Sequence, residues 1–338
     1  MNILLFSIIN LLNLLIIYLI NKYRISISKK LKLIDFPDSS RKIHFKETPL
    51  IGGLIIVIIY FTNTVFFFYT FDISSNSLFI LVLTLWGFLI GYLDDRISVN
   101  PYLRLFLIGG ALLIILSLND NLVIRNLYFE LTNFNLVLNY LSIPFTILSI
   151  LLLVNAINLS DGINSLAMII IIYFSLYLYF NTLDQNKYLI INLIISLTIL
   201  SYLNFKGNFF LGNSGSYQLG MLISLSIISS YNSKLDQGIM TNSEELFIIL
   251  ILPGLDMFRI FIERLINKQN PFSGDKQHLH HYLIKKYSLK ISLFAYLIML
   301  STPYICYQVT NYKPILIITA SIILYFIIIF HLRKFNLK

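Results

Sequence analysis

Long apolar runs separated by short polar segments follow one another along nearly the whole chain. The first run has no basic segment before it and no small-residue cleavage site after it, so we expect a retained helix. No internal repeat or low-complexity linker interrupts the series, so residues 1–338 are expected to form one integral membrane domain. Runs long enough to cross a bilayer, which takes about 20 residues with some latitude, lie at 3–20, 50–69, 78–92, 104–118, 138–154, 165–181, 187–203, 218–231, 243–261, 289–309 and 314–331.

The pattern therefore predicts an all-α polytopic membrane protein with about eleven transmembrane helices. Pro144, Pro253 and Pro303 lie within these runs and predict kinks, because proline removes a backbone donor from a helix. Basic loops stay in the cytoplasm, and this rule favours an outside N-terminus and a cytoplasmic C-terminus. In that orientation only four of the 25 Lys and Arg residues face outward, namely Arg125, Lys187, Lys234 and Lys313.

Composition supports this class of protein and narrows the chemistry. The chain is 57% hydrophobic with a mean hydropathy of +0.79, whereas roughly 45–50% apolar residues is usual for soluble domains. The single cysteine, Cys306, excludes a disulfide framework and a cysteine-based metal site. All five histidines fall on the predicted inner side, so we expect the function at the cytoplasmic face and no nucleic-acid partner.

Asp94 and Asp95 form an adjacent carboxylate pair at the inner end of a predicted helix. Ionisable residues in membrane segments are costly and are therefore biased toward function. Carboxylates suit Mg²⁺, a hard cation that takes oxygen ligands and keeps waters and substrate phosphates in its shell. The alternative is a solvated helix end, with Arg96 and Arg104 as counterions.

The segment NAINLSDGINSLA, residues 155–167, is a second polar interruption between apolar runs. Asn155, Asn158 and Asp161 are spaced three apart and would line one helix face if the helix continues to Asp161. Their amides and carboxylate suit a sugar, a base edge or a hydrated metal. The alternative is a polar loop in which Asn158 or Ser160 caps a helix.

Three further segments carry candidate chemistry. In LGNSGSYQLG, residues 211–220, glycines allow close backbone approach, and N–H groups before a helix can bind an anion, although such turns are common. Residues 263–286 hold His278, His280 and His281, which with Arg259, Arg264 and Lys276 give a basic cluster suited to phosphates. Zinc is the rival ligand there, but no pair of histidines is spaced i, i+4 and no cysteine is present.

The third segment, residues 35–53, contains Arg41, Lys42 and His44 shortly before Pro49 and the next predicted helix. A basic stretch in this place attracts anionic lipid headgroups whether or not it takes part in catalysis. Attraction to lipid accounts for the charges but not for the combination of proline, histidine and paired glycines.

In this order, the motifs resemble those of the polyprenyl-phosphate N-acetylhexosamine-1-phosphate transferases, a glycosyltransferase family 4 superfamily that includes bacterial GlcNAc-1-phosphate transferases and the phospho-MurNAc-pentapeptide translocase. The resemblance covers residues 35 to about 283 and rests on five ordered motifs. It implies that a lipid phosphate, undecaprenyl phosphate in bacteria, attacks the β-phosphate of a UDP-sugar with Mg²⁺, or alternatively Mn²⁺, and releases UMP. It also implies the bacterial cytoplasmic membrane, a role in cell-wall or surface-glycan synthesis such as O-antigen formation, and leaves a homodimer open.

The resemblance assigns roles residue by residue. It implicates Arg41, Lys42 and His44 near the lipid phosphate or diphosphate, and Asn155 and Asn158 at the nucleotide and metal, with Arg264 as a further substrate contact. It makes Asp94, Asp95 and Asp161 metal-binding and catalytic residues, and it places His278 on the substrate and His280 and His281 in catalysis. The HxHH form favours the GlcNAc-1-phosphate branch over the MurNAc-pentapeptide branch.

This chain departs from the family pattern at two positions. Asn164 stands where the family usually has a second aspartate, and Asn213 stands where the GDxGS motif has a metal-binding aspartate. An asparagine carbonyl can bind Mg²⁺, but it contributes no negative charge. A homologue that binds lipid phosphate or UDP-sugar without turnover is therefore an alternative. A transporter is less favoured, because transporter sites lie near the bilayer midplane.

Overall fold

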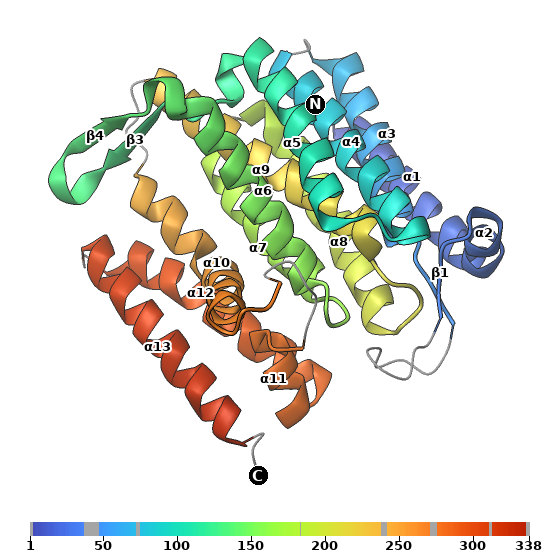
Figure 1. Cartoon of the computed structure of the whole chain (residues 1–338). Helices are drawn as coiled ribbons and strands as arrows, with labels where there is room; N and C mark the ends of the chain where they lie inside the picture. Colours follow the sequence, from blue (N-terminus) through green and yellow to red (C-terminus); the bar gives the residue numbers. More distant parts are fainter. Residues whose placement is uncertain are drawn as a thin grey trace.

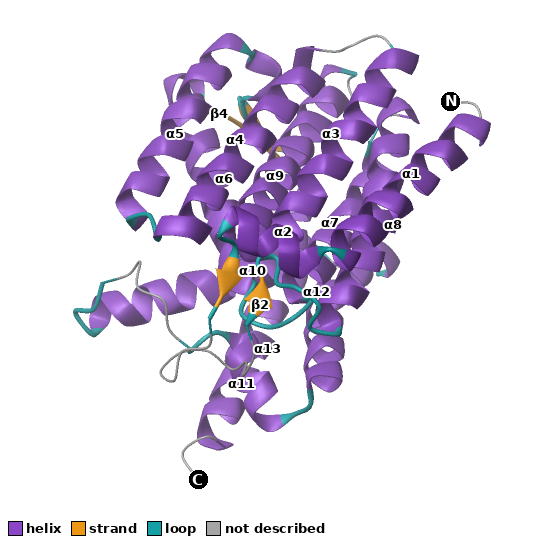
Figure 2. Ribbon diagram, turned by 90° about the vertical axis from the view of Figure 1, so that its right-hand side faces the viewer, coloured by secondary structure: helices purple, strands orange, loops and turns teal. Residues whose placement is uncertain are grey.

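The computed structural model describes residues 3–36, 47–71, 75–182, 184–237, 242–270, 276–310 and 313–335. Nearly all of this is helical (Figure 2). Eleven helices in the described part have 16 residues or more: α1 (Ile3–Lys22), α3 (Gly52–Thr70), α4 (Ser75–Ile97), α5 (Pro101–Leu118), α6 (Ser142–Ser160), α7 (Leu166–Asn181), α8 (Asp184–Phe205), α9 (Gly212–Asp236), α10 (Ser243–Ile266), α12 (Leu289–Val309) and α13 (Pro314–Phe335). Two short helices, α2 (Arg24–Leu31) and α11 (Leu279–Lys286), lie between them.

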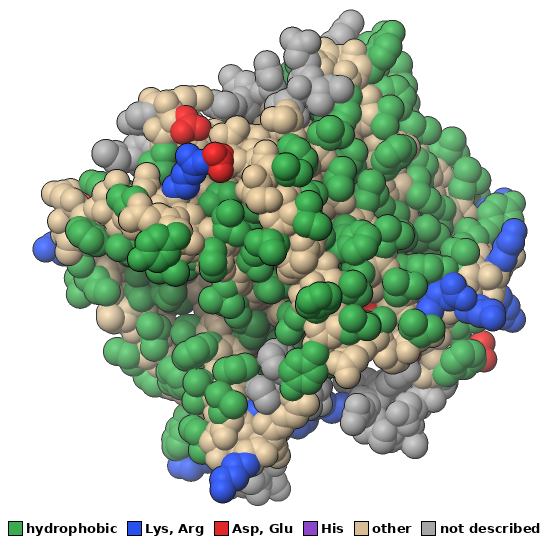
Figure 3. Space-filling view, turned by 45° about the horizontal axis from the view of Figure 1, so that its top comes forward, with side chains coloured by type: hydrophobic (Ala, Val, Ile, Leu, Met, Phe, Trp, Pro, Cys, Tyr) green, Lys and Arg blue, Asp and Glu red, His purple; other side chains and the backbone are tan. Residues whose placement is uncertain are grey.

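Eight of the long helices are apolar and long enough to cross a membrane by length and composition, counted over the described residues. Hydrophobic side chains cover much of the face in Figure 3, and basic side chains gather toward its edges. The expected all-α polytopic membrane protein is therefore confirmed. Helices α7, α9 and α10 do not meet the same criterion, because α7 has only 16 residues and the other two carry more polar side chains.

The most enclosed helix is α9, which packs against α4 and α6 most extensively and against α3 and α7 as well (Figure 1). Its polar sequence is stable inside the protein because the surrounding helices, rather than lipid, form its environment. Its first turn contains the GNSGS segment, so these residues do not form a loop before the helix, as the sequence suggested, but belong to the helix itself.

Two small antiparallel sheets accompany the helices. Strands β1 (Ile34–Asp35) and β2 (Thr48–Pro49) pair near α2, and β3 (Asn126–Phe129) and β4 (Phe134–Val137) form a hairpin at the other end of the bundle (Figure 1). The apolar pattern of the sequence predicted helices only, so this hairpin was not predicted. The short helix α2, α11 and the C-terminal end of α13 lie at the end opposite the hairpin.

Of the three prolines that predicted kinks, Pro253 and Pro303 lie in helix interiors and Pro144 does not. Pro253 lies inside α10, and the C-terminal half of this helix turns away from the direction of its first half (Figure 2). Pro144 instead lies in the first turn of α6, where backbone N–H groups have no partner inside the helix and a proline removes no bond. The bend matters because the half of α10 after Pro253 carries Asp256 and Arg259.

Glycines let α3 and α4 approach the first turn of α9 backbone to backbone. A Cβ atom added at Gly91 would lie 2.3 Å from the carbonyl oxygen of Asn213, and one added at Gly53 would lie 2.5 Å from the backbone nitrogen of Gly215. Gly212 adopts a φ of +75°, and a Cβ there would also lie 2.8 Å from a carboxylate oxygen of Asp95. These contacts hold the first turn of α9 against the end of α4.

Gly91→Ala should therefore destabilise the protein by about 1–3 kcal/mol, the usual cost of overpacking a tight interface. Gly110→Ala is the matched control, because Gly110 also lies within a helix but has no atom within 4 Å of an added Cβ. There alanine should be neutral or slightly stabilising, since it lowers the entropy cost of helix formation. Thermal unfolding in detergent measures both, and equal melting temperatures would contradict the packing argument.

Candidate active site

The N-terminus of α9 and the carboxylate of Asp95 form the centre of the candidate site. The backbone N–H groups of Asn213 and Ser214 donate to Asp95 Oδ1 and Oδ2 over 2.8 and 3.0 Å. A helix N-terminus favours a negative charge. The anion that the Gly-Ser segment binds in this structure is thus a side chain of the protein itself.

Asp161 reaches the same helix end from α6. The helix ends at Ser160, and Asp161 follows it and accepts a hydrogen bond from the backbone N–H of Gly212. Loss of solvent around the half-buried carboxyl group and the neighbouring charge of Asp95 raise the pKa of Asp161 well above its usual range. The structure thus brings Asp95 and Asp161 together, although 66 positions separate them in the sequence.

Asp94 has a different environment from Asp95. Its Oδ2 accepts from Arg104 Nη1 at 2.5 Å and from the Tyr217 hydroxyl at 3.1 Å, and its Oδ1 accepts from the backbone N–H of Val99 at 2.7 Å. The side chain is 4% exposed. Arg104 is therefore the counterion that the alternative interpretation of the sequence named, and Asp94 can bind a metal only by exchanging some of these contacts. Its predicted role as a metal ligand stays a prediction.

Of the two asparagines of the NxxNxxD pattern, Asn158 lies at the candidate site and Asn155 does not. Asn158 Oδ1 accepts from the hydroxyl of Ser216 at 2.7 Å and so joins α6 to the first turn of α9. Asn155 instead donates to the carbonyl of Leu151, 2.8 Å away in its own helix. Asn158 therefore lies at the same helix end as Asp161, and Asn155 lies one turn deeper in the bundle.

The turn after Asp161 is held in an uncommon shape by α8. Ser165 has a φ of 71°, which is unfavourable for a residue with a side chain. Its backbone N–H donates to Asn204 Oδ1 at 2.5 Å and its hydroxyl to the carbonyl of Ser201 at 2.7 Å. Asn204 in turn donates to the carbonyl of Phe209, just before α9. Asn204 thus links both chain segments that supply the site, and we had not identified it from the sequence.

The histidine motif lies directly against Gly162. A Cβ atom added to Gly162 would lie 2.3 Å from His280 Nε2 and 3.0 Å from the ring of His281. Burial, and then the two neighbouring histidines, lower the pKa of His280 well below its usual range. His280 is therefore neutral at pH 7, and the structure places the HxHH motif against the segment that follows Asp161. The catalytic role of these histidines stays a prediction.

Asp256 is a further candidate residue, which the sequence analysis did not identify. It is buried on α10, and His278 Nδ1 lies 2.8 Å from its Oδ2. A carboxylate within a predicted transmembrane run was the signal that could have revealed it, since such groups are expensive without a partner. Asp256 is flanked by apolar residues, so the pattern there predicted only a transmembrane run.

The other residues predicted for the site lie in different parts of the protein. Arg41, Lys42 and His44 lie outside the described residues. Arg264 is buried in the last turn of α10. Asn213 is half-buried in the first turn of α9, where its backbone serves Asp95. Its side chain has the right place in the sequence for a metal ligand, and its role stays a prediction.

The fit to Mg²⁺ depends on two carboxylates rather than on a complete cage. Among the described residues no group of three or more His, Cys, Asp or Glu could hold a metal ion. Asp95 and Asp161 nevertheless lie together with no ion pair to a basic side chain in the described part of the chain. Two partly desolvated like charges favour a proton or a cation between them. Mg²⁺ is usually bound by one or two carboxylates plus substrate phosphates, and these residues fit that pattern.

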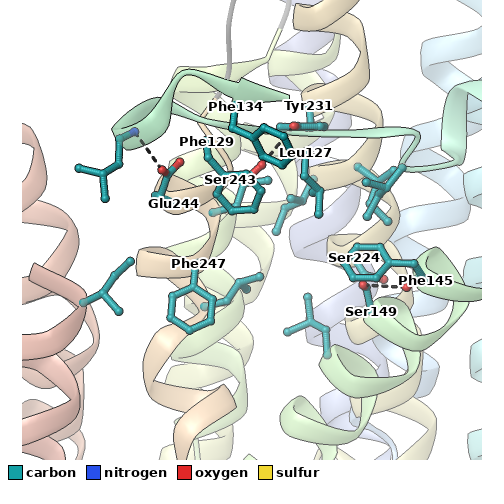
Figure 4. A pocket seen from close by; sticks show the side chains of 18 of the residues that line it. Leu127, Phe129, Phe134, Phe145, Ser149, Ser224, Tyr231, Ser243, Glu244 and Phe247 are labelled. Atoms are coloured by element: carbon teal, nitrogen blue, oxygen red, sulfur yellow. Dashed lines mark hydrogen bonds between the residues drawn. The ribbon is translucent and has the colours of Figure 1, made fainter. Parts of the chain in front are cut away.

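A large apolar cavity of 660 Å³ lies at the hairpin end of the bundle. The hairpin, α6, α9, α10 and the start of α13 line it, almost entirely with hydrophobic side chains. Figure 4 shows Leu127, Phe129 and Phe134 of the hairpin above the space, with Phe247 and Phe145 from the helices below. Its innermost residue on α6, Leu153, is eight positions before Asp161, or about 12 Å at the helical rise.

Comparison with known proteins places this geometry in context. The family model described as glycosyl transferase family 4 matches residues 77–231, which contain Asp94, Asp95, Asp161 and Asn213. The probable undecaprenyl-phosphate N-acetylglucosaminyl 1-phosphate transferase of Bacillus subtilis (strain 168) is 32% identical over 286 residues, covering 82% of this chain and 76% of its own. The undecaprenyl-phosphate alpha-N-acetylglucosaminyl 1-phosphate transferases of Escherichia coli O157:H7 and Thermotoga maritima are each 28% identical and cover 77% of this chain, and 71% and 75% of their own lengths.

Proposed function

The chain belongs to glycosyl transferase family 4, and from this we propose that it transfers a sugar 1-phosphate, N-acetylhexosamine 1-phosphate first among them, from a UDP-sugar to undecaprenyl phosphate with release of UMP. The observation that carries the proposal is the meeting of Asp95 and Asp161 at the N-terminus of α9. Relatives named for this transfer match the chain across that site.

Phosphoryl transfer asks a protein mainly for positioning and charge neutralisation. Mg²⁺, when bound, would neutralise charge that develops on the diphosphate. Asp95 and Asp161 would hold it, with Asn213 beside them, and the backbone N–H groups of α9 keep both carboxylates in place. His280 and His281 of the HxHH motif border the site at Gly162 and would offer hydrogen-bonding ring nitrogens to the substrate.

The apolar cavity supports a lipid substrate. Its lining has no charged side chain except Glu244, which accepts hydrogen bonds from the backbone N–H groups of Glu130 and Leu131 at the rim. An undecaprenyl chain is far longer than the distance of about 12 Å along α6 between Asp161 and the cavity. In this proposal the phosphate lies at the α9 N-terminus, and part of the isoprenoid chain lies under the hairpin.

We place the site at the cytoplasmic face of a bacterial cytoplasmic membrane, with eleven crossings, an outside N-terminus and a single membrane domain. The short helix α2, with Lys29 and Lys30 in its last turn, and the end of α13, with Arg333 and Lys334, lie at the same end of the bundle as α11 (Figure 1). Basic residues gather on the cytoplasmic side of membrane proteins. The products would serve cell-wall or surface-glycan synthesis.

The test is UMP release by the purified protein with undecaprenyl phosphate, Mg²⁺ and a panel of UDP-sugars that includes UDP-GlcNAc and UDP-MurNAc-pentapeptide. Release should require the lipid, stop when EDTA removes the metal, and return with Mg²⁺. Preference for UDP-MurNAc-pentapeptide would instead identify a translocase. Folded protein that releases no UMP from any sugar would contradict the proposal.

A binding homologue without turnover is the second candidate, and Asn213 is the observation that favours it. Asn213→Asp should lower the Mg²⁺ concentration that gives half-maximal activity, because it adds a charge to the ligand set. If UMP release appears only in this variant, the natural chain is a binding protein.

A further inference from the structure

Asp256 is a buried carboxylate on α10 that is surrounded by hydrogen-bond donors. Its Oδ1 accepts from Arg259 Nη2 at 2.9 Å, from the Tyr325 hydroxyl at 2.8 Å and from the backbone N–H of Leu279 at 3.0 Å. Arg259 Nε also donates to the Tyr325 hydroxyl at 2.7 Å. A guanidinium and two further donors on one oxygen stabilise the ionised carboxylate.

The other oxygen, Oδ2, faces a single group, which is His278 Nδ1 at 2.8 Å. An ionised carboxylate can only accept hydrogen bonds, so Nδ1 must carry the proton in this pair. This fixes the tautomer of a neutral His278 and leaves Nε2 as the nitrogen with a lone pair. In the imidazolium form both nitrogens carry protons, and Nδ1–H still donates to Asp256.

The ring of His278 lies beside the candidate site through its contact with His280. His278 Nε2 is buried and has no hydrogen-bond partner among the described residues. The ring of His278 stacks on that of His280, with 5.6 Å between centroids and 5° between planes, and His280 lies against Gly162 next to Asp161. A buried nitrogen without a partner is costly unless a ligand or a water completes it.

We propose that Asp256 is a positioning residue that holds His278 with Nδ1 protonated, so that Nε2 is presented to the diphosphate of the bound sugar nucleotide. The inference rests on the proposed function for the identity of that ligand. In this geometry a proton on Nε2 would be donated to a phosphate oxygen, while Asp256 accepts from Nδ1–H on the opposite edge of the ring. Tyr325 extends this arrangement to α13, which lies beyond the region matched by the family model.

The first test needs no activity. The chain has only five histidines, so ¹⁵N-histidine labelling of the natural protein in detergent gives few signals, and His278→Asn assigns that of His278. We expect a protonated Nδ1, with or without a proton on Nε2. A neutral ring with the proton on Nε2 alone would overturn the proposal.

The second test is a double-mutant cycle on UMP release with Asp256→Asn and His278→Asn. Loss of a carboxylate that orients a functional histidine costs about 10–100-fold, and we expect this loss in kcat with little change in KM for the UDP-sugar. Because Asp256 acts through His278, the double variant should be no slower than His278→Asn alone. If the kcat losses of the two single variants multiply in the double variant, the proposal is overturned. That result would mean that Asp256 acts independently of His278, as a purely structural residue would.

Glu263→Gln is the matched control, because Glu263 is the other carboxylate on Arg259 and does not contact His278. It should change kcat by less than about twofold, because Glu263 is partly exposed and glutamine keeps an acceptor for Arg259. Should Asp256→Asn not fold, Asp256→Glu, which keeps the acceptor, takes its place in the cycle. If the natural protein releases no UMP, the proposed function fails, and the ¹⁵N measurement still decides the Asp256–His278 pair.

Discussion

Asp161→Asn is expected to reduce UMP release by at least about 100-fold, because loss of even an outer partner of a metal ligand costs about 10–100-fold. Asparagine has nearly the same shape and can still accept the N–H of Gly212, so the turn after α6 should keep its form. What disappears is one of two negative charges at the N-terminus of α9. The measurement is kcat/KM at saturating Mg²⁺.

The same substitution should not destabilise the metal-free protein. It removes a carboxyl group that is partly out of water and lies beside Asp95, so the melting temperature in EDTA should stay equal or rise. Asp120→Asn is the control, because Asp120 is exposed and paired with Arg125 near the hairpin. If Asp161→Asn is as active as the control Asp120→Asn, Asp161 takes no part in the reaction.

The raised pKa of Asp161 also predicts how the stability of the metal-free protein depends on pH. A folded-state pKa above the unfolded value of 3.8 means that the folded chain binds the proton more tightly. This contribution to stability is full below 3.8 and declines as pH rises through the folded pKa. Thermal unfolding in EDTA across that range should show the decline in the natural protein, and a smaller one in Asp161→Asn.

Arg259→Met is expected to cost about 3–5 kcal/mol of stability, the usual effect of removing one partner from a buried ion pair. The side chains of Arg259 and Asp256 are 3% and 6% exposed. Methionine keeps much of the apolar stem, so the loss reflects the carboxylate left without its cation. Arg259 also donates to the carbonyl of Gln277 and to Tyr325, so the start of α11 and α13 should loosen together.

Arg333→Met is the matched control in the same cluster. Arg333 pairs with Glu263, but the two side chains are 37% and 27% exposed, and exposed pairs contribute about 0–1 kcal/mol. Chemical unfolding in detergent, followed by tyrosine fluorescence and circular dichroism, compares the two variants. Equal losses would show that burial of the Asp256–Arg259 pair does not decide its contribution.

The helices were predictable because each one is a long apolar run, and length alone identifies a segment that can satisfy its backbone inside a membrane. Their ends were harder to predict. The expected run at 218–231 begins in the structure at Gly212, because α9 is enclosed by other helices and tolerates Gly, Ser and Asn in its first turn. The β3–β4 hairpin was missed, since a short strand pair outside the apolar runs has no comparable length signal.

The candidate site was predictable as a set of residue types and not as a set of contacts. Asp94 and Asp95 are neighbours with the same apparent chemistry, yet one pairs with Arg104 and the other caps α9. Which of the two faces the backbone N–H groups depends on the rotation of α4 against α9. That rotation is decided by the close approach at Gly91, a contact between distant parts of the chain.

The sequence by itself determined that this is a polytopic membrane protein and that its candidate site residues lie at the ends of apolar runs. These properties follow from composition and from the order of apolar and polar segments, because each segment's preference for membrane or water depends on its own residues. Only the tertiary structure decided that Asp95 and Asp161 share one helix N-terminus, and that Asp256 orients His278. Both pairings join helices far apart in the chain, and they depend on packing and desolvation, which no local pattern records.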